Sequence, residues 1–235
     1  MAGLGSRFSS AGYKKPKPFI DVNGKPMIER VLDNLSYPGA KYILIAKDEH
    51  LIYESKLVDR IKNKYNVEFV STEILTEGTA ATVLLARRHI NNEEPLVIAN
   101  SDQIVDIDFY RFVNECMGSD IDGSIMTFFD KEKDPKWSFA LIDSQGYVKE
   151  VKEKIPISHH ATVGIYMFNR GRFFVDSAID MIVHNDRVNG EFYTCPVYNY
   201  MIQSGKKINI FEIDYKDMYG LGTPNDLEYF LKLDK

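Results

Sequence analysis

Apolar and polar positions follow two different periods along the chain. Over residues 27–35 the apolar side chains recur every three to four positions, which is the period of an amphipathic helix. Residues 41–46 (KYILIA) form a nearly continuous apolar run, which is typical of a buried strand. The predicted helices are 27–35, 49–63, 79–90, 108–117, 171–184, 192–204 and one from residue 224; the predicted strands are 41–46, 67–71, 95–99, 123–130, 138–143, 147–152, 161–168 and 207–213.

This order of elements predicts the fold class. Strands that alternate with helices of about ten to fifteen residues indicate an α/β fold with a Rossmann-like, doubly wound and mostly parallel sheet, in which residues 95–99 form a central parallel strand. The three strands between residues 138 and 168 lack such helices, so we expect them to form a small antiparallel excursion. Ligands are expected at the carboxyl ends of the parallel strands.

The start of the chain departs from this pattern. A glycine-rich loop normally follows a first central strand, but the first glycines here are Gly3 and Gly5, so the first strand is missing. Either Met1 is an internal methionine of a longer protein, or the fold omits its innermost strand. Omitting a central strand would leave two exposed edges, and we therefore favour a longer protein.

Composition and charge exclude several classes of protein. The 235 residues (27.0 kDa) are 44% hydrophobic, which is enough for a buried core, and they contain no repeat or linker that would divide the chain. The formal net charge of −5 argues against nucleic-acid binding. Cys116 and Cys195 form no metal-binding or disulfide pattern, which favours a reducing cytoplasm. No apolar run approaches the roughly 20 residues that span a membrane, so we expect neither membrane insertion nor export.

The first candidate site is a loop near the N-terminus. Glycines at positions 3 and 5 allow backbone N–H groups to approach a phosphate, and Arg7 supplies a fork of donors. Lys17 lies between two prolines that stiffen the chain, so its ammonium is well placed to reach the same phosphates. The residues expected to bind nucleotide in this loop are Ala2, Gly3, Gly5 and Ser6.

Residues 3–8 (GLGSRF) and 16–32 (PKPFIDVNGKPMIERVL) together resemble the signature of the sugar-phosphate nucleotidyltransferases, also called nucleoside-diphosphate-sugar pyrophosphorylases. The resemblance is strongest over residues 2–30 and continues in spaced motifs to residues 222–224. It implies a GT-A-like nucleotidyltransferase fold in one domain over residues 1–235, with a nucleotide-binding part at about 1–115 and an acceptor-binding part at about 120–225. It also implies transfer of a nucleotidyl group from a nucleoside triphosphate to a phosphorylated acceptor, with Mg²⁺ and release of pyrophosphate. Arg7 and Lys17 would then be catalytic residues that hold the triphosphate.

The resemblance also implies a metal site. Asp102 follows the strand at 95–99, where the family has a metal-binding aspartate, and a hard oxygen ligand suits Mg²⁺. The family's second metal aspartate lies two residues before the glycine of a Gly-Thr motif, and this chain has Gly220 there. We favour Asp217 as its substitute; Asp214, or a metal held by one carboxylate, phosphates and water, are the alternatives.

For the base, the family uses a turn that corresponds to Gly78 and Thr79, with a polar side chain about five residues earlier. That position is Glu73, where relatives acting on thymidine or uridine nucleotides commonly have glutamine. An ionised glutamate only accepts hydrogen bonds, so it suits the exocyclic amine of cytosine and favours CTP. The alternative is that Thr72, Thr76 or backbone groups read the base.

The acceptor half of the chain resembles the family in its Glu-Lys motif. By that resemblance Lys154 binds the acceptor phosphate, and Glu153 binds hydroxyl or amino groups of the acceptor. Gly164 lies in the strand that follows, and the segment around Glu191 and Tyr193 loosely matches another acceptor-side segment.

Two departures lie where a hexose would bind. Ile155 replaces a proline, and Phe139-Ala140 replaces Tyr-Gly. These changes leave room for a non-sugar acceptor, such as a phosphorylated alcohol, amino-acid derivative or choline-like compound, as in cytidylyltransferases that supply cell-surface polysaccharide or capsule precursors. A UTP- or dTTP-dependent sugar-1-phosphate pyrophosphorylase is the alternative. Two further alternatives are a glycosyltransferase and a non-catalytic nucleotide-binding module. Ser101-Asp102-Gln103 lacks the second aspartate of the D-x-D motif that is usual in glycosyltransferases. Family members are monomers, dimers or tetramers, so a homo-oligomer stays open.

Overall fold

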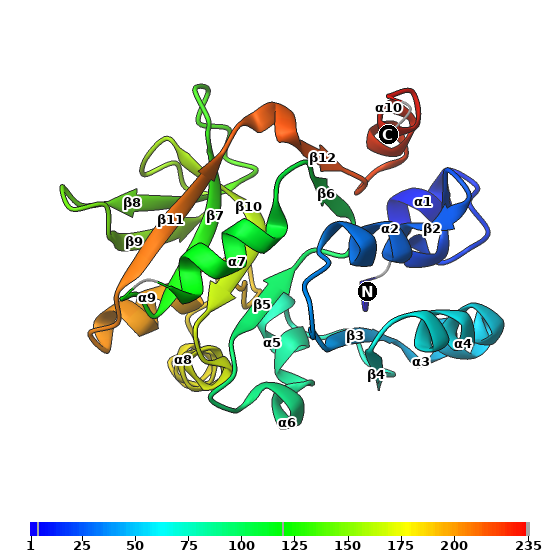
Figure 1. Ribbon diagram of the computed structural model, residues 1–235, viewed down its shortest axis with the longest axis horizontal. Coiled ribbons are helices and arrows are strands. Elements are labelled where there is room, and N and C mark those ends of the chain that lie inside the picture. The colour runs from blue at the N-terminus through cyan, green and yellow to red at the C-terminus, as the bar shows by residue number, and fades with distance from the viewer. Residues whose placement is uncertain (4, 119, 234–235) are drawn as a thin grey trace. The chain divides into compact units, whose positions relative to one another are not determined.

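The computed structural model describes residues 1–3, 5–118 and 120–233 (Figure 1). The chain divides into two compact units. Unit 1 contains Met1–Leu75, Asn100–Phe109 and Lys216–Lys235, and unit 2 contains Thr76–Ala99 and Tyr110–Tyr215. The sequence-based division near residues 115–120 therefore falls inside unit 2, and the C-terminal segment belongs to the same unit as the N-terminal loop.

The described residues of unit 1 form three small sheets. Strands β3 (Tyr42–Lys47) and β4 (Val67–Thr72) pair in parallel and are connected by helices α3 (Asp48–Tyr53) and α4 (Ser55–Lys64). Strands β1 (Asp21–Val22) and β2 (Lys25–Pro26) form a hairpin before helix α2 (Met27–Asn34). Strands β6 (Gln103–Val105) and β12 (Met218–Gly220) pair antiparallel, which joins two distant parts of the chain. Unit 1 also contains α1 (Ser6–Ser10), the 3₁₀ turn η1 (Lys17–Phe19) and α10 (Pro224–Leu231).

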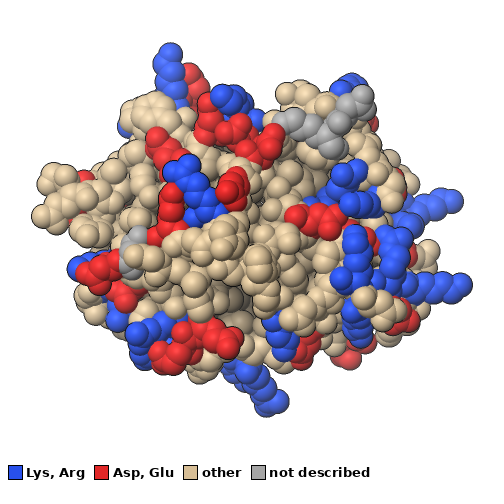
Figure 2. Space-filling view, viewed as in Figure 1, with Lys and Arg blue, Asp and Glu red and all other residues tan. Residues whose placement is uncertain are grey.

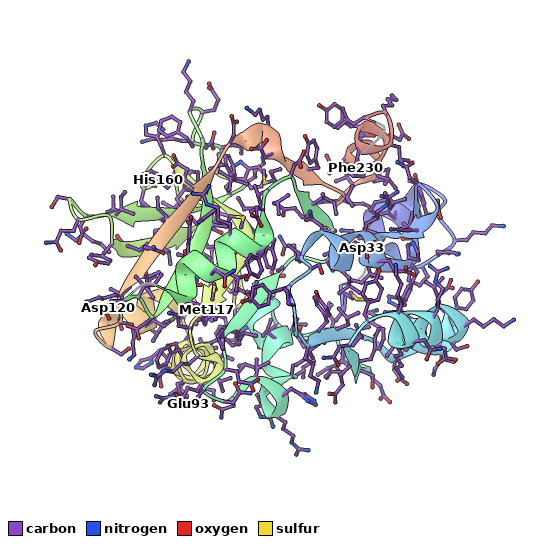
Figure 3. The ribbon with its side chains drawn as sticks, in the orientation of Figure 1. Asp33, Glu93, Met117, Asp120, His160 and Phe230 are labelled. Atoms are coloured by element: carbon purple, nitrogen blue, oxygen red, sulfur yellow. The ribbon has the colours of Figure 1, made fainter. Side chains whose placement is uncertain are left out.

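Helix α2 contributes to two apolar clusters of unit 1. Met27 lies in a cluster with Phe8 and with Phe230 of α10, which is labelled in Figure 3. Ile28, one residue further along α2, packs in the second cluster with side chains of β3 and α4. The predicted amphipathic helix thus buries its apolar positions on two sides, and it fixes the N-terminal loop, α10 and the β3–β4 pair within one unit.

Unit 2 is built on one mixed sheet. Its strands follow the order β11 (Ile208–Ile213), β7 (Gly123–Phe129), β10 (His160–Phe168), β8 (Ser138–Ile142) and β9 (Val148–Glu153), with β5 (Leu96–Ala99) also on β10. Figure 1 shows β11, β7 and β10 side by side. The β11–β7 pairing is parallel, and the other pairings of this sheet are antiparallel. The α/β class is confirmed, and β5, which the sequence predicts as a parallel strand, runs antiparallel to its described partner β10.

The described helices of unit 2 are α5 (Thr79–Leu84), α6 (Arg87–Ile90), α7 (Phe109–Met117), whose first residue belongs to unit 1, α8 (Gly171–Val183) and α9 (Val197–Gln203). Helices α8 and α9 pack on this sheet, and α5 and α6 contact α8. Tyr198 of α9 is fully buried, stacks on Phe168 and donates its hydroxyl to the Met167 carbonyl at 2.8 Å. That hydrogen bond satisfies the hydroxyl inside an apolar core.

Three predicted helices differ from the observed ones. The helix predicted over 49–63 is broken at Glu54, and the helix predicted over 79–90 is broken at Leu85-Ala86. The helix predicted over 192–204 begins only at Val197. Its first predicted residues are not helical because the Phe192 N–H and carbonyl are hydrogen-bonded to residues 77 and 80 instead.

Cys116 and Cys195 are both buried, and neither forms a disulfide bond within the part of the chain that the structure describes. In the part of the chain that the structure describes, no helix has the length and apolar character needed to cross a membrane. On the face shown in Figure 2, basic and acidic side chains lie next to one another over much of the surface.

Candidate functional site

The ammonium of Lys17 and the carboxylate of Asp102 form an ion pair in unit 1. Both side chains are mostly buried, with 22% of Lys17 and 28% of Asp102 exposed. The Lys17 ammonium also lies 5.7 Å from the centre of the Phe8 ring. The sequence predicted these two residues for the same phosphate and metal site, and the structure brings them together.

The backbone on each side of this pair is fixed by local structure. Lys17 opens η1 between two prolines, and Phe19 anchors the turn because its side chain is buried. Asp102 directly precedes β6, and its carbonyl accepts a hydrogen bond of 2.7 Å from the Leu221 N–H. The β6–β12 register pairs Gln103 with Gly220, so the segment after β12 passes directly beside Asp102.

Gly222 leaves space above the ion pair. A Cβ atom at this position would lie 3.2 Å from Asp102 Oδ2, 3.8 Å from Lys17 Nζ and 4.0 Å from Asp226 Oδ2. A larger residue would therefore fill the space that these three charged groups share. Asp226 is a residue that the sequence reasoning missed. Its sequence signal is the helix start Thr223-Pro224, because an acidic residue is common three positions after an N-cap.

The glycine-rich loop continues into α1. Gly5 caps this helix with a positive φ of 62°, and its carbonyl accepts the Phe8 N–H at 3.0 Å. A Cβ on Gly5 would lie 3.5 Å from the Lys17 Cβ, so the loop lies against the lysine, while Gly3 faces open space. Arg7 is exposed, as a residue that binds a ligand in solution needs to be. Ala2 is buried, and Ser6 is the first residue of α1.

The structure does not bring Asp217 to Asp102. Asp217 directly precedes β12, and its carbonyl accepts the Asp106 N–H at 2.7 Å. The register then runs from Met218 opposite Val105 to Gly220 opposite Gln103. Asp217 therefore lies three strand residues from Gly220, which is about 10 Å along an extended chain. Asp214 belongs to unit 2 and lies outside the β6–β12 pairing.

Glu73 directly follows β4 and is exposed. Of the alternative base-reading groups, the Thr72 hydroxyl donates to the Ile74 carbonyl at 3.1 Å, and the Thr76 hydroxyl is hydrogen-bonded to Thr82. Both threonine hydroxyls are thus engaged within the protein. Glu73 has no hydrogen bond or ion pair to another described residue, which leaves its carboxylate available to a ligand.

In unit 2, Gly78 is held against Phe192. The Phe192 N–H donates to the Glu77 carbonyl at 2.7 Å, and the Ala80 N–H donates to the Phe192 carbonyl at 2.9 Å. Gly78 has a φ of 117°, and a Cβ there would lie 2.6 Å from the Phe192 nitrogen, which no side chain tolerates. The Thr79 hydroxyl accepts the Thr194 N–H at 3.0 Å. Both residues therefore tie the start of α5 to the segment around residue 192.

Glu153, Lys154 and Tyr193 come together in unit 2. The Lys154 ammonium donates to the Tyr193 hydroxyl at 2.8 Å and lies 4.6 Å from the centre of its ring. Glu153 is buried and accepts a hydrogen bond from the Ser138 hydroxyl. Lys154 has a positive φ of 59°, a conformation that costs a non-glycine residue about 1–2 kcal/mol and that recurs at ligand sites.

The electrostatics of this cluster follow from burial and contact. Desolvation raises the pKa of Glu153, while Ser138 and the Lys154 charge partly oppose the shift. The hydrogen bond to Tyr193 raises the pKa of Lys154, so its charge is maintained. Burial raises the pKa of Tyr193, and Glu191 raises it further. Glu191, which is exposed, therefore belongs to the same cluster.

Gly164 lies in an irregular part of β10. The β10–β7 register shifts between Thr162 and Tyr166, and Gly164 has a positive φ of 90° within this shift. A bulge of this kind changes the direction of neighbouring side chains and often lies next to a functional site. Gly164 thus shapes the strand, and its role toward an acceptor remains a prediction.

The donor atoms in unit 1 fit a magnesium ion. Asp102 and Asp226 offer hard carboxylate oxygens around the space at Gly222, and Mg²⁺ in such sites keeps several waters and binds phosphate oxygens. Among the described residues, no three His, Cys, Asp or Glu side chains gather as a complete metal site. Asp102 and Asp226 would leave the other coordination positions of such an ion to phosphates and water.

The chain is similar in sequence and fold to nucleotidyl transferases. The family model described as Nucleotidyl transferase matches residues 1–209. A solved structure of a nucleoside-diphosphate-sugar pyrophosphorylase from Vibrio cholerae RC9 matches with a TM-score of 0.84 and 25% identity, covering 99% of this chain and 98% of that one. The predicted nucleotidyltransferase fold is therefore confirmed.

Two curated relatives match most of the chain. The bifunctional protein GlmU of Methanococcus aeolicus is 29% identical over 175 residues, 73% of this chain and 39% of the relative. The mannose-1-phosphate guanylyltransferase catalytic subunit beta of Drosophila pseudoobscura pseudoobscura is 28% identical over 174 residues, 72% of this chain and 46% of the relative. The chain thus spans less than half the length of either relative.

Proposed function

The chain belongs to the nucleotidyl transferase family, and we propose that it transfers a nucleoside monophosphate, CMP in the favoured case, from a nucleoside triphosphate to a phosphorylated small molecule. In this reaction an oxygen of the acceptor phosphate attacks the α-phosphorus. The bond between the α-phosphorus and the bridging oxygen breaks, and pyrophosphate leaves. No protein group has to remove a proton, because the acceptor phosphate is already an anion.

The proposed triphosphate site consists of Lys17, Arg7 and Asp102 in unit 1. Lys17 and Arg7 would neutralise the charge that develops on the α-phosphate and the leaving pyrophosphate, which is the main contribution a protein makes to phosphoryl chemistry. Asp102 would hold Mg²⁺, which would help to neutralise the charge of the triphosphate. The observation that carries the proposal is the Lys17–Asp102 ion pair, since it joins a phosphate-binding cation to a metal-binding carboxylate.

The preference for CTP rests on Glu73. Its carboxylate accepts hydrogen bonds and donates none, so it favours the cytosine amine over the O4 oxygen of uracil or thymine. The engagement of the Thr72 and Thr76 hydroxyls within the protein supports Glu73 over the alternative readers.

The proposed acceptor site is the cluster of Glu153, Lys154 and Tyr193 in unit 2, with Glu191 beside it. Lys154 supplies a fixed positive charge for the acceptor phosphate, and Glu153 accepts a hydrogen bond from a hydroxyl or ammonium of the acceptor. Ile155, next to Lys154, is 52% exposed and stands where the family usually has proline. This departure supports a phosphorylated alcohol, amino-acid derivative or choline-like compound of the kind used for capsule precursors.

A sugar 1-phosphate acceptor is the second candidate. It is favoured by the relative named mannose-1-phosphate guanylyltransferase and by the structural neighbour named nucleoside-diphosphate-sugar pyrophosphorylase. Under this candidate the nucleotide would be GTP, UTP or dTTP. The two candidates share the unit 1 chemistry and differ in the base and the acceptor.

One experiment separates these candidates. Each of CTP, UTP, dTTP, GTP and ATP is incubated with the protein, Mg²⁺ and a panel of phosphorylated sugars, alcohols and choline, and pyrophosphate release is measured. Release that requires CTP and a non-sugar phosphate supports the proposal. Release with a sugar 1-phosphate and another nucleotide establishes the second candidate, and no release with any pair contradicts both.

A further inference from the structure

Asp226 lies beside the Lys17–Asp102 ion pair. Oδ2 of Asp226, Oδ2 of Asp102 and Nζ of Lys17 all lie within 4.0 Å of the point where a Cβ on Gly222 would be. Two carboxylates and one ammonium thus surround a space that the protein keeps open by having glycine there. The Lys17 ammonium balances one of the two carboxylate charges, and the remaining negative charge favours a further cation in this space.

Asp226 also occupies the place that a side chain at residue 220 would reach. A Cβ on Gly220 would lie 3.9 Å from both Cγ and Oδ2 of Asp226. A carboxylate that started from residue 220 would therefore meet the one that Asp226 supplies. Gly220 is opposite Gln103, next to Asp102, so this place faces the metal-binding aspartate.

The Asp226 carboxylate is held in a defined position. Its Oδ2 accepts a hydrogen bond of 2.7 Å from the Thr223 hydroxyl, and its backbone N–H donates to that hydroxyl at 3.2 Å. Helix α10 is fixed to the core of unit 1 by Leu227, which is 1% exposed, and Phe230, which is 3% exposed. Asp226 itself is exposed, so a ligand can reach it.

We propose that Asp226 is the second carboxylate ligand of the divalent cation, acting with Asp102 and taking the place of the side chain that Gly220 lacks. The proposal rests on the proposed function, because the nucleotide phosphates complete the coordination of the ion. Asp217, which the sequence favoured, lies three strand residues, about 10 Å, from Gly220, so the geometry favours Asp226 over it. Gly222 is needed because any side chain there would fill the space for the ion.

The test measures binding of Mn²⁺ to the full chain without nucleotide, by calorimetry and by electron paramagnetic resonance, so it does not depend on turnover. Asp226→Asn and Asp102→Asn should each weaken Mn²⁺ binding about tenfold or more. In Asp226→Asn the new amide can still accept the Thr223 hydrogen bond through its carbonyl, so the helix start is preserved. Glu228→Gln, an exposed carboxylate on the same helix, is the matched control and should bind as wild type.

A rescue variant strengthens the test. Gly220 has ordinary contact distances for a Cβ, so Gly220→Asp fits without displacing the backbone. In the Asp226→Asn background, Gly220→Asp should restore Mn²⁺ binding to within a few-fold of wild type. A merely structural role of Asp226 in capping α10 would show no such rescue.

The outcomes separate this proposal from the proposed function. The assignment of Asp226 is overturned if Asp226→Asn binds Mn²⁺ as tightly as the wild type. It is also overturned if Asp217→Asn loses Mn²⁺ binding while Asp226→Asn does not. If Asp226→Asn loses Mn²⁺ binding and the wild type releases pyrophosphate from none of the nucleotides, the assignment of Asp226 is supported and the proposed function is contradicted. If the wild type turns over and Asp226→Asn binds Mn²⁺ as the wild type does, the proposed function stands and Asp226 is not a metal ligand.

Discussion

The Lys17 ammonium is ion-paired with the Asp102 carboxylate, 85 residues further along the chain. A divalent cation held by Asp102 would compete with this ammonium for the carboxylate. In the proposed reaction Asp102 would hold the cation and Lys17 would bind the phosphates. The ion pair keeps both charged groups together at the proposed site.

Replacing Lys17 with Met should separate metal binding from catalysis. Without the competing ammonium, Mn²⁺ should bind about threefold or more tightly in the absence of nucleotide. Turnover should nevertheless fall about 100-fold or more, because the cation that stabilises the triphosphate in the transition state is lost. Calorimetry with Mn²⁺ and a pyrophosphate-release assay measure the two effects. Weaker metal binding in Lys17→Met would contradict the competition.

We expect Arg7 to contribute to turnover and not to the stability of the fold. It is exposed, so Arg7→Ala should leave the free energy of unfolding within about 0.5 kcal/mol of wild type. The kcat should fall by about two to three orders of magnitude, since a charged donor to the developing phosphate charge is removed. Urea unfolding and steady-state kinetics test this pair of results. Arg111→Ala, an exposed arginine of unit 2, is the control and should retain full activity.

Glu73→Gln should relax the choice of base. Glutamine offers both a donor and an acceptor, so it can face uracil as well as cytosine. We expect the ratio of kcat/KM for CTP to that for UTP to fall by an amount equivalent to about 1–3 kcal/mol, the value of one base-edge contact. Competition between the two nucleotides in a single assay measures the ratio directly. An unchanged ratio would show that Glu73 does not read the base.

Gly78→Ala should disturb the loop at the start of α5. The added Cβ would collide with the backbone of Phe192, and the φ of 117° is unfavourable for alanine, so we expect a loss of stability of about 1–3 kcal/mol. Gly146→Ala is the matched control, because it also has a positive φ but meets no atom within 4 Å. Thermal unfolding of both variants compares a glycine held against Phe192 with one in open space. An equal loss in both would mean that the positive φ alone accounts for the effect.

The features that could be predicted from the sequence are local or are carried by a family resemblance. The amphipathic pattern of α2 follows from side chains within one helix, so the observed helix over Met27–Asn34 agrees with it. Lys17 and Asp102 were each predicted for the phosphate and metal site, and Lys154 and Tyr193 for the acceptor side, because the resemblance placed them there. The structure then supplied the contacts that hold them.

The features that could not be predicted depend on pairing between distant segments. Strands β6 and β12 have three residues each, too few for a periodic signal, yet their register decides that Gly220 and not Asp217 lies beside Asp102. Asp226 is hidden for a different reason. An acidic residue soon after Thr-Pro is what any helix start favours, so its position near a second carboxylate is visible only in the fold.

Glu153 should make stability depend on pH in a direction opposite to that of most carboxylates. Burial raises its pKa in the folded protein above the usual value of 4.5. At a pH above 4.5 but below the raised pKa, the folded protein keeps a proton that the unfolded chain has lost. The free energy of unfolding therefore falls as the pH rises through this window, and the loss is complete above the raised pKa.

Glu153→Gln removes this titration and keeps an acceptor for the Ser138 hydroxyl. Urea unfolding of wild type and variant, in steps of pH upward from 4.5, gives the difference between their free energies of unfolding. Groups such as Asp33, whose lowered pKa gives the opposite slope, are present in both proteins and cancel. The difference should shift in favour of the variant as the pH rises and then become constant. A difference that stays constant from pH 4.5 upward would mean that the pKa of Glu153 is the same in the folded and the unfolded protein. Burial would then not hold a proton on Glu153 near the proposed acceptor site.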